Sequence, residues 1–501
     1  MLKIRNLLKH LDVNKAVGPD GIPPCVLKFC APELAPVLCK LFNLSLSSGI
    51  CPTDWKKADV FPVPKKGDRS NPLNYRPISI TSVLCKVMES LMNDKILSFL
   101  EADNINFFSD HQYGFRKRRS TGDLLSYISH SWSSVIDKGG LAAVISLDIS
   151  KAFDRVWHPC LINKLHHAGI NPSIIAWINS YLFNRSLSVR IDNIHSKEFR
   201  FNAGVPQGCV LAPTLFLIYI NDLLSITDSQ IHSYADDSTP HTTALPGRNN
   251  VINYVPAASS LTTDLSKIIQ WGKANLVEFN TSKTHQLLIS HRHDTDDFPS
   301  IFMGDDNVDN ETSLSMLGVT LDSKLSWKKH ISSISISAAR KLGFLFRAKA
   351  YFTPSQLLTL YKSQIRPVLE YCSHVWAGAP VNSLRLLDSI QNKAIRLIDD
   401  PSLTSNLQTL SHRRAVGSLS LFYRYYFGLC SSELQKIVPH PVVYRKSTRK
   451  ASNLNPYFVN LEHCRTSSHA SSFIPRTAAL WNKLPLKFSL LVVIFINLRV
   501  T

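Results

Sequence analysis

The sequence lacks the features that would send the protein out of the cell or into a membrane. It begins Met1-Leu2-Lys3-Ile4-Arg5, without an apolar core of signal-peptide length, so we do not expect secretion. Its longest apolar run, residues 490–496, is far too short to span a bilayer. We therefore expect an intracellular protein without a membrane-spanning segment.

Paired cysteines and repeats are also missing. The ten cysteines are scattered without any Cys-x-x-Cys pair, which excludes a zinc finger or knuckle. They are typical of reduced intracellular thiols. No internal repeat or low-complexity tract is present.

What the sequence does have is length and positive charge. The 501 residues are enough for two or three subdomains with cores of their own, and 44% of them are hydrophobic. Lys and Arg number 56 against 37 Asp and Glu, a formal net charge of +19. Such an excess predicts an anionic partner, either nucleic acid or an acidic membrane.

The stretch Ser233-Tyr234-Ala235-Asp236-Asp237-Ser238 predicts a tight hairpin that carries two adjacent acids. Two neighbouring Asp on a straight strand would point to opposite faces, whereas at a turn both can approach one point. Carboxylates held that close repel each other unless cations lie between them, and hard oxygen ligands suit Mg²⁺. The alternative is a solvated acidic turn. Pro240, just beyond, should remove one hydrogen bond from the ladder of that strand.

A third acid, Asp148, lies near the end of residues 141–149, an almost continuous apolar run of the buried-strand type. A carboxylate there must be paired or bound to a metal. Phe153 follows five positions later. The helical stretch at 159–183 carries Trp177, Tyr181 and Phe183, which we expect in the core.

Two basic segments are candidates for binding phosphate. Lys65, in a turn after a predicted strand, and Arg76, on the next strand, suit a triphosphate, although a solvated basic turn is equally compatible with the pattern. Residues 112–121 place four consecutive cations, Arg116, Lys117, Arg118 and Arg119, beside two aromatic residues. This combination is typical of single-stranded nucleic-acid binding, in which cations contact the backbone and aromatic rings contact the bases. A nuclear-localisation patch is the competing interpretation. Ser120 or Thr121 should cap the helix that follows.

The remaining segments are a loop and a helical region. Residues 203–208, Ala-Gly-Val-Pro-Gln-Gly, form a loop whose glycines let backbone approach a ligand closely. Beyond about residue 325, apolar residues recur at spacings of three and four, which predicts a helical subdomain.

In this order, the motifs resemble the reverse transcriptase of a non-LTR retrotransposon, most similar to the Jockey-like group. The matching segments are 75–79 (Tyr-Arg-Pro-Ile-Ser), 114–116, 147–154, 204–208, 234–237 (Tyr-Ala-Asp-Asp), 280–283 and 317–319, with 473–477 and 480–482 near the end. Together they cover nearly the whole chain from about residue 15. The endonuclease that such elements carry upstream is missing, so we expect a piece of a longer protein. Arg118 stands where family members usually have Gly.

The resemblance implies an α+β fold, a right-hand polymerase with fingers, a palm built on an antiparallel sheet, and a helical thumb. The expected divisions are an N-terminal helical extension at 1–44, fingers and palm at 45–322, the thumb at 323–400, and a mostly helical C-terminal region at 401–501. The last fifteen residues, 487–501, are unlike the family's usual ending and suggest read-through or a shifted frame.

The resemblance also assigns roles to single residues. Asp148 and Asp236, with Asp237 more peripheral, would bind two Mg²⁺ ions, or Mn²⁺, and Lys283 would donate a proton to pyrophosphate. Lys65 and Arg76 would hold the nucleotide's triphosphate, Gln207 would touch the templating base pair, and Leu317 with Gly318 would grip the primer. Phe153 would be a steric gate against the 2′-hydroxyl. The alternative is that Phe153 is only a core residue.

The implied function is RNA-directed DNA polymerisation, with an RNA template, a DNA primer and deoxynucleoside triphosphates as partners. The protein would act as a ribonucleoprotein in the nucleus or cytoplasm, without a membrane partner, and no protein partner can be inferred. The main alternative is a catalytically idle transposon remnant that only binds nucleic acid. An RNA-templated RNA polymerase is disfavoured by Phe153.

Overall fold

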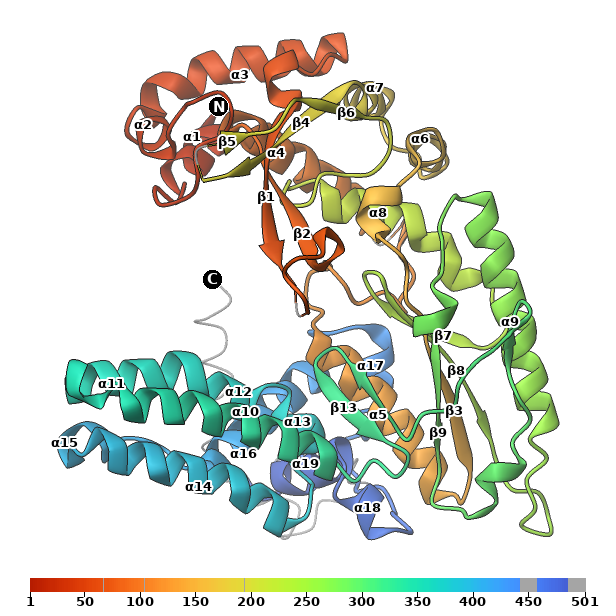
Figure 1. The fold of residues 1–501 in the computed structure, drawn as a ribbon. Coiled ribbons are helices and arrows are strands. Elements are labelled where there is room, and N and C mark those ends of the chain that lie inside the picture. Colours follow the sequence, from red (N-terminus) through yellow and green to blue (C-terminus); the bar gives the residue numbers. More distant parts are fainter. Residues whose placement is uncertain (66, 103, 193, 442–456, 485–501) are drawn as a thin grey trace, which may run out of the picture. The chain divides into compact units, whose positions relative to one another are not determined.

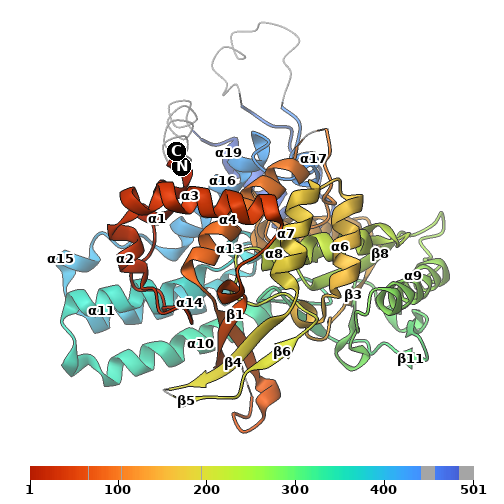
Figure 2. The ribbon, with the colours of Figure 1, turned by 90° about the horizontal axis from the view of Figure 1, so that it is seen from above.

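The computed structural model describes residues 1–65, 67–102, 104–192, 194–441 and 457–484 (Figures 1 and 2). The chain forms two compact units, each assembled from three segments. The first unit contains residues 1–115, 148–227 and 266–280, and the second contains 116–147, 228–265 and 281–501. The unusual ending predicted for 487–501 lies outside the described residues.

The first unit contains a mixed sheet that begins with a hairpin. Strand β1 (Lys57–Pro64) pairs antiparallel with β2 (Tyr75–Ile80) and parallel with β4 (Arg185–Ile191). Two short strands, β5 (Ile194–His195) and β6 (Phe199–Phe201), each pair antiparallel with β4, and Figure 2 shows them beside it. The predicted strands around the basic turn are thus present.

Among the described residues, seven α-helices belong wholly to the first unit. They are α1 (Leu2–Lys9), α2 (Pro24–Phe29), α3 (Ala31–Ser48), α4 (Val83–Leu100), α6 (His158–His167), α7 (Pro172–Leu182) and α8 (Ala212–Ile220). Helix α8 is apolar all around and nearly all its residues are buried, as expected for a central helix. Trp177 and Tyr181 are buried as predicted, but the prediction for Phe183 is wrong, because it is 71% exposed. Helix α7 ends at Leu182, so Phe183 leaves the packed face in an extended conformation.

The second unit contains a four-stranded antiparallel sheet in the order β7-β8-β3-β9. Its strands are β3 (Leu141–Ser146), β7 (Gln230–Tyr234), β8 (Asp237–Ala244) and β9 (His285–Ile289). The first five residues of β3 are 0% exposed, which explains their continuous apolar sequence. Together with its helices, this sheet confirms the predicted α+β class.

Pro240 interrupts the ladder between β3 and β8. The two strands pair from Leu141↔Ala244 to Val144↔His241, and pairing in the same register returns only at the isolated bridge Leu147↔Ser238. That register sets Pro240 opposite Ile145. Because proline has no N–H, the lost hydrogen bond predicted from the sequence falls on an interior strand of the sheet.

Helices make up most of the rest of the second unit. They are α5 (Thr121–Asp137), α10 (Lys328–Arg347), α11 (Pro354–Leu360), α12 (Arg366–Glu370), α13 (Ser373–Trp376), α14 (Val381–Ile398), α15 (Pro401–Thr404), α16 (Leu410–Tyr426), α17 (Ser432–Lys436), α18 (Ser467–Ala470) and α19 (Phe473–Trp481). Helix α9 (Val255–Ala274) starts in this unit and continues into the first. A hairpin of β12 (Ser313–Met316) and β13 (Val319–Asp322) precedes α10, and the short pair β10 (Phe302–Met303) and β11 (Asp306–Asn307) comes before it.

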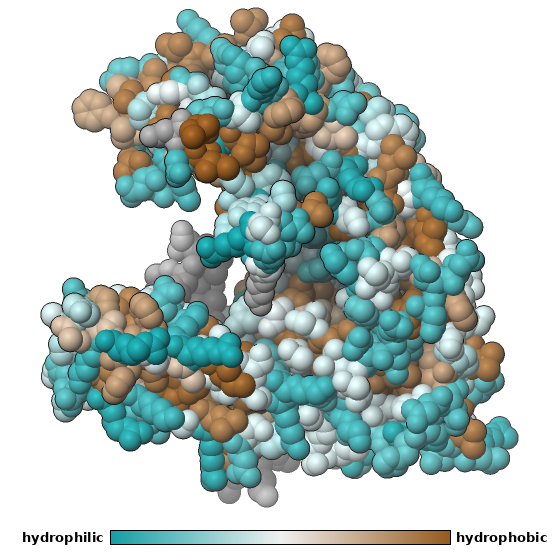
Figure 3. Space-filling view, in the orientation of Figure 1, coloured by the Kyte–Doolittle hydropathy of each residue, from teal (hydrophilic) through white to brown (hydrophobic). Residues whose placement is uncertain are grey.

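The helical region predicted after residue 325 is therefore present. Its surface mixes hydrophilic and hydrophobic residues over α10 and α11 (Figure 3), and Phe344 and Phe346 of α10 are exposed. Within the described residues, no helix combines the length and apolar character needed to cross a bilayer. The domain boundaries implied by the resemblance stay predictions.

Candidate active-site residues

The acidic hairpin is present where the sequence predicts it. Strands β7 and β8 pair as far as Tyr234↔Asp237, which leaves only Ala235 and Asp236 in the loop. Ala235 has a φ of 59°, the left-handed conformation that tight two-residue hairpins need. Asp236 therefore lies in the turn, half-buried, and Asp237 is the exposed first residue of β8.

The end of β3 is bridged to the same hairpin. Leu147 pairs with Ser238, the residue after Asp237. Asp148 follows Leu147 in the chain and is half-buried. Because β3 ends at Ser146, Asp148 lies just beyond the strand, whereas the sequence predicted a position near the strand's end. In the first unit its carbonyl oxygen accepts a hydrogen bond from the Asn280 N–H at 2.9 Å.

A buried chain of hydrogen bonds supports the hairpin strands in the second unit. Trp132 Nε1 lies 3.3 Å from His241 Nδ1, His241 Nε2 lies 3.0 Å from His232 Nδ1, and His232 Nε2 lies 3.0 Å from a carboxylate oxygen of Glu433. An indole N–H only donates, so His241 Nδ1 accepts and its Nε2 carries the proton. His241 Nε2–H then donates to His232 Nδ1, and His232 Nε2–H donates to the Glu433 carboxylate, where the chain ends. No sequence pattern predicts this network.

Lys283 lies at the same end of the β3–β9 pair as the end of β3. The last residues in register are Ser146 and His285, and Lys283 ends the short 3₁₀ turn Thr281–Lys283 just before β9. Its side chain is exposed. The register of β3 and β9 therefore places Lys283 at the same end of the sheet as the bridge between Leu147 and Ser238.

Lys65 and Arg76 lie on either side of the first unit's basic hairpin. Val63 pairs with Arg76, and the Lys65 N–H donates to the Asn74 carbonyl at 2.6 Å, one step beyond the end of β1. Both side chains are exposed. The two cations therefore belong to one hairpin, as the sequence predicts, with Lys65 in its turn rather than on the strand.

The loop at 203–208 is attached on two sides within the first unit. The Ser79 N–H donates to the Gln207 carbonyl at 2.7 Å, and the Val205 N–H donates to the Phe153 carbonyl at 2.8 Å. A Cβ at Gly208, where φ is 105°, would lie 2.8 Å from the Ser79 carbonyl oxygen. These contacts tie the loop to β2 on one side and to the turn at Phe153 on the other.

The Gln207 side chain donates to the Asp154 carboxylate at 3.1 Å. Although Asp154 as a residue is exposed, partial burial of its carboxyl group raises its pKa, while the Gln207 hydrogen bond and the charges of Lys151 and Lys65 act in the opposite direction. Lys65 and Gln207 thus act on the same carboxylate. Asp154 was not singled out from the sequence, although it lies next to Phe153.

A buried carboxylate holds the helix that follows this loop. Glu89 accepts hydrogen bonds from the Val210 and Leu211 N–H groups, at 2.7 and 3.1 Å, at the start of α8. Burial raises the pKa of Glu89, while these hydrogen bonds and the nearby Arg185 charge lower it. Glu89 thereby fixes the residues directly after Gln207.

Phe153 is held between two aromatic residues of the first unit. Its ring stacks on Phe216 of α8, with centroids 4.5 Å apart and planes 21° apart. Phe115 meets it edge-on at 6.3 Å. The ring is half-buried, so both the gate and the core interpretations remain compatible with its position.

The basic segment 116–119 enters α5 in the second unit. Ser120 caps α5 by accepting from the Asp123 N–H, as predicted. Asp123 is fully buried and accepts from Tyr425 at 2.7 Å and Arg424 at 3.3 Å, both from α16. Arg118 has a φ of 59°, a left-handed conformation that glycine adopts more readily than other residues. Lys117 and Arg118 are exposed, whereas Arg116 and Arg119 are half-buried.

Leu317 and Gly318 form the turn between β12 and β13, with φ values of 48° and 80°. The Tyr371 hydroxyl donates to the Leu317 carbonyl oxygen at 2.9 Å and lies 3.1 Å from the Thr121 hydroxyl. Tyr371 therefore connects this turn to the start of α5, directly after the basic segment. Tyr371 could not be found from the sequence, because no local pattern links these three elements.

Buried histidines are a further feature of the second unit that the sequence did not reveal. His374 donates from Nε2 to the Gly122 carbonyl at 3.1 Å, and burial lowers its pKa to about 4. Burial lowers the pKa values of His130 and His330 to about 4 as well.

Comparison with known proteins agrees with the motif order. The family described as "Reverse transcriptase (RNA-dependent DNA polymerase)" matches residues 63–321. The chain is 28% identical over 408 residues to the RNA-directed DNA polymerase from mobile element jockey of Drosophila melanogaster, covering 79% of this chain and 43% of that protein. It is 29% identical over 405 residues to the probable RNA-directed DNA polymerase from transposon X-element of the same species, with the same coverages.

Among solved structures, apo telomerase from Candida tropicalis aligns with a TM-score of 0.42 and 11% identity, over 81% of this chain and 68% of that one. The chain spans less than half the length of the two curated relatives.

Proposed function

This chain belongs to the reverse transcriptase (RNA-dependent DNA polymerase) family, as its resemblance to Jockey-like elements indicated, and we propose that it is the RNA-directed DNA polymerase of a non-LTR retrotransposon. It extends a DNA primer on an RNA template with deoxynucleoside triphosphates. The observation that carries the proposal is the acidic hairpin, closed at Tyr234↔Asp237 and bridged at Ser238 to the residue before Asp148.

Asp148, Asp236 and Asp237 are the proposed metal ligands. Reverse transcriptases generally use divalent metal ions. The three side chains fit such ions, because each is a hard oxygen donor that remains at least partly accessible. We propose two Mg²⁺ ions, with Mn²⁺ as a substitute. When bound, such a pair activates the attacking oxygen and stabilises the leaving one.

The first unit supplies the residues proposed for the incoming nucleotide. Lys65 and Arg76, exposed on one hairpin, hold the triphosphate, the Lys as a point charge and the Arg as a fork. Gln207 contacts the templating base pair, and its loop is fixed by the Ser79 and Phe153 hydrogen bonds. Phe153, immobilised on Phe216, excludes a 2′-hydroxyl.

The second unit supplies the residues proposed for the primer–template and the leaving group. Residues 116–119 bind the phosphate backbone, and the turn at Leu317 and Gly318 positions the primer. The Tyr371 contacts support a common role in binding the primer–template, because they join the turn to the start of α5, directly after residues 116–119. Lys283 donates a proton to the departing pyrophosphate. The protein acts inside the cell, in the nucleus or cytoplasm, as a complex with its RNA.

The second candidate is an idle transposon remnant that binds nucleic acid without copying it. The acids, Arg76 and Lys283 are all present, which favours the active enzyme. Primer extension on poly(rA)/oligo(dT) with Mg²⁺ separates the two. We expect dT incorporation that requires the template and stops when EDTA removes the metal. Binding of the same primer–template without any extension, with Mg²⁺ or Mn²⁺, would instead support the remnant.

A further inference from the structure

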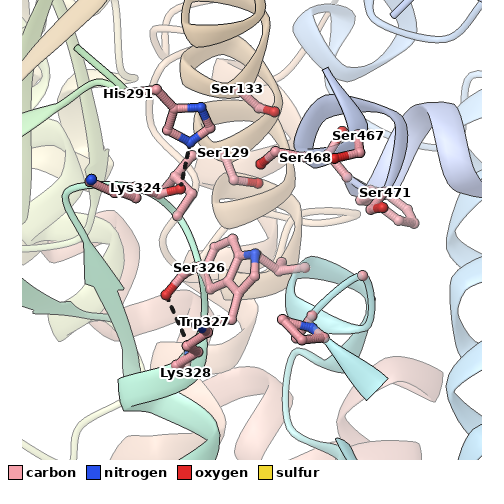
Figure 4. A pocket seen from close by; sticks show the side chains of 17 residues that line it. Ser129, Ser133, His291, Lys324, Ser326, Trp327, Lys328, Ser467, Ser468 and Ser471 are labelled. Atoms are coloured by element: carbon pink, nitrogen blue, oxygen red, sulfur yellow. Dashed lines mark hydrogen bonds between the residues drawn. The ribbon is translucent and has the colours of Figure 1, made fainter. Parts of the chain in front are cut away.

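A pocket of about 410 Å³ lies within the second unit, apart from the candidate active-site residues (Figure 4). Its walls come from α5, from residues 324–328 after β13, from the segment 375–380, and from 467–473 around α18. In Figure 4, Ser467, Ser468 and Ser471 stand on the opposite side from His291 and Lys324. The volume is in the range of small-ligand sites.

The chemistry of the walls favours an anion. None of the 17 described lining residues is Asp or Glu, whereas His291, Lys324 and Lys328 are basic and seven are Ser. Across the described part of the chain, neither lysine makes an ion pair. Three of the serine hydroxyls are bonded elsewhere, Ser326 to Asp322, Ser133 to His469 and Ser129 to the Ser126 carbonyl. The Ser472 hydroxyl is buried without a hydrogen-bond partner.

An aromatic ring lines the same pocket in a strained backbone position. Trp327 has a φ of 62°, a conformation that is rare for a bulky residue, and it precedes α10 as a cap without a side-chain hydrogen bond. Strain of this kind often marks a functional position. Trp327 is 8% exposed, and its indole is one of the apolar groups that line the pocket, while the adjacent start of α10 adds positive potential.

We propose that this pocket binds one unpaired nucleotide of an RNA strand, with its base against Trp327 and its phosphate between Lys324 and Lys328. Cations beside an aromatic ring are the usual means of holding single-stranded nucleic acid. The pocket lies at the end of β13 opposite the turn at Leu317 and Gly318, a strand of four residues and so roughly 13 Å long. A strand held at that turn can therefore reach the pocket. The inference rests on the proposed function in one respect, namely that the bound RNA strand is the template of the polymerase.

The sharpest test uses two adjacent lysines. Lys328 lines the pocket, whereas Lys329 is bonded to the hydroxyls of Thr312 and Ser313 at 3.0 and 3.3 Å and does not line it. Lys328→Glu and Lys329→Glu change the charge equally. Fluorescence anisotropy with a labelled ten-nucleotide oligouridylate, in EDTA and without nucleoside triphosphates, measures binding alone. We expect about tenfold weaker binding for Lys328→Glu and less than twofold for Lys329→Glu.

Equal losses in both variants would overturn the proposal, because charge alone would then explain binding. Competition by free UMP would assign the pocket to a mononucleotide, and competition only by unlabelled RNA to a strand. An oligonucleotide with one 4-thiouridine should crosslink to the peptide that contains Trp327; crosslinks confined to other peptides would also overturn it. Because this assay contains EDTA and no nucleoside triphosphates, it measures binding without extension, and failure here leaves the proposed polymerase activity untouched.

Discussion

The two units differ in which candidate residues they carry. All four residues proposed for the nucleotide, Lys65, Arg76, Phe153 and Gln207, belong to the first unit. The cations at 116–119 and the turn at Leu317 and Gly318, proposed for the primer–template, all belong to the second. Substrate binding and nucleic-acid binding should therefore be separable by mutation, because each depends on the packing of its own unit.

The units also differ in which buried groups have shifted pKa values. The first buries an acid, Glu89, whose pKa is raised, so its proton is bound more tightly in the folded state and acid favours folding at this group. The second buries His330 and His374 and partly buries His130, all with pKa values of about 4, so acid opposes folding there. The first unit contains one histidine of this kind, His158, whose pKa burial also lowers. Acid should therefore loosen the second unit first.

The largest expected effect comes from the acids. Asp236→Asn should reduce kcat for extension by a thousandfold or more, about 4 kcal/mol in the barrier, because a metal ligand is lost. The fold should persist, since Asp236 lies in a turn. Single-turnover extension together with thermal unfolding measures both. Asp148→Asn should behave alike, and near-normal extension by either variant would remove the metal assignment.

Lowering the pH should destabilise the second unit before it destabilises the first. The pKa of His374 in the folded state is about 4, below its ordinary value, so the stabilisation present above pH 6.5 is lost as the pH falls toward 4. For this one group the loss approaches about 3 kcal/mol. Hydrogen exchange at pH 7 and pH 5, followed by mass spectrometry, should show peptides of α5 and α13 opening before those of β1 and α4. His374→Gln should weaken the pH dependence, and earlier opening of the first unit would contradict this difference between the units.

Removing the cations at 116–119 should weaken nucleic-acid binding without changing nucleotide binding. With all four changed to Ala, the log–log salt slope should become shallower by roughly one unit for each phosphate that is no longer neutralised. KM for dTTP at saturating primer–template should stay within about twofold. The control changes four exposed lysines of the first unit, Lys9, Lys15, Lys28 and Lys40, to Ala. An equal change of slope in the control would mean that net charge, not this segment, governs binding.

The smallest effect concerns the choice of sugar in the first unit. Phe153→Val should keep deoxynucleotide incorporation within about tenfold, roughly 1.4 kcal/mol, and raise ribonucleotide incorporation by more. The measurement is the ratio of kcat/KM for dGTP and GTP on one template. Phe216→Leu is the matched control, because it alters the packing behind the ring without removing it. If Phe153→Val leaves the ratio unchanged, Phe153 is only a core residue.

Local signals explain what the sequence could predict. The apolar run at 141–149 identified β3, and Ser120 marked the start of α5, because burial and capping depend on neighbouring residues. Asp148 lies past the strand, since regular pairing in β3 ends at Ser146, and helix periodicity did not reveal that α7 ends before Phe183. Element types were therefore more predictable than their ends.

The contacts that support the candidate site were not predictable in this way. The chain from Trp132 through His241 and His232 to Glu433 joins four elements that are far apart in sequence. A lone histidine in a strand has no spacing that distinguishes it from a surface histidine. Only the register of β7 and β8 brings the two rings together.

That same hydrogen-bonded chain has a consequence for synthesis on the ribosome. His232 and its acceptor Glu433 are separated by 201 positions. At about 5–20 residues per second, Glu433 emerges roughly 10–40 s after the strand it completes. A nascent chain interrupted before α17 would contain every catalytic candidate, from Lys65 to Lys283. It would still lack the Glu433 carboxylate, which is the last acceptor in the hydrogen-bonded chain that supports the acidic hairpin. A chain that ends before α17 should therefore fold with less stable hairpin strands than the full chain, although it contains all of the catalytic candidates.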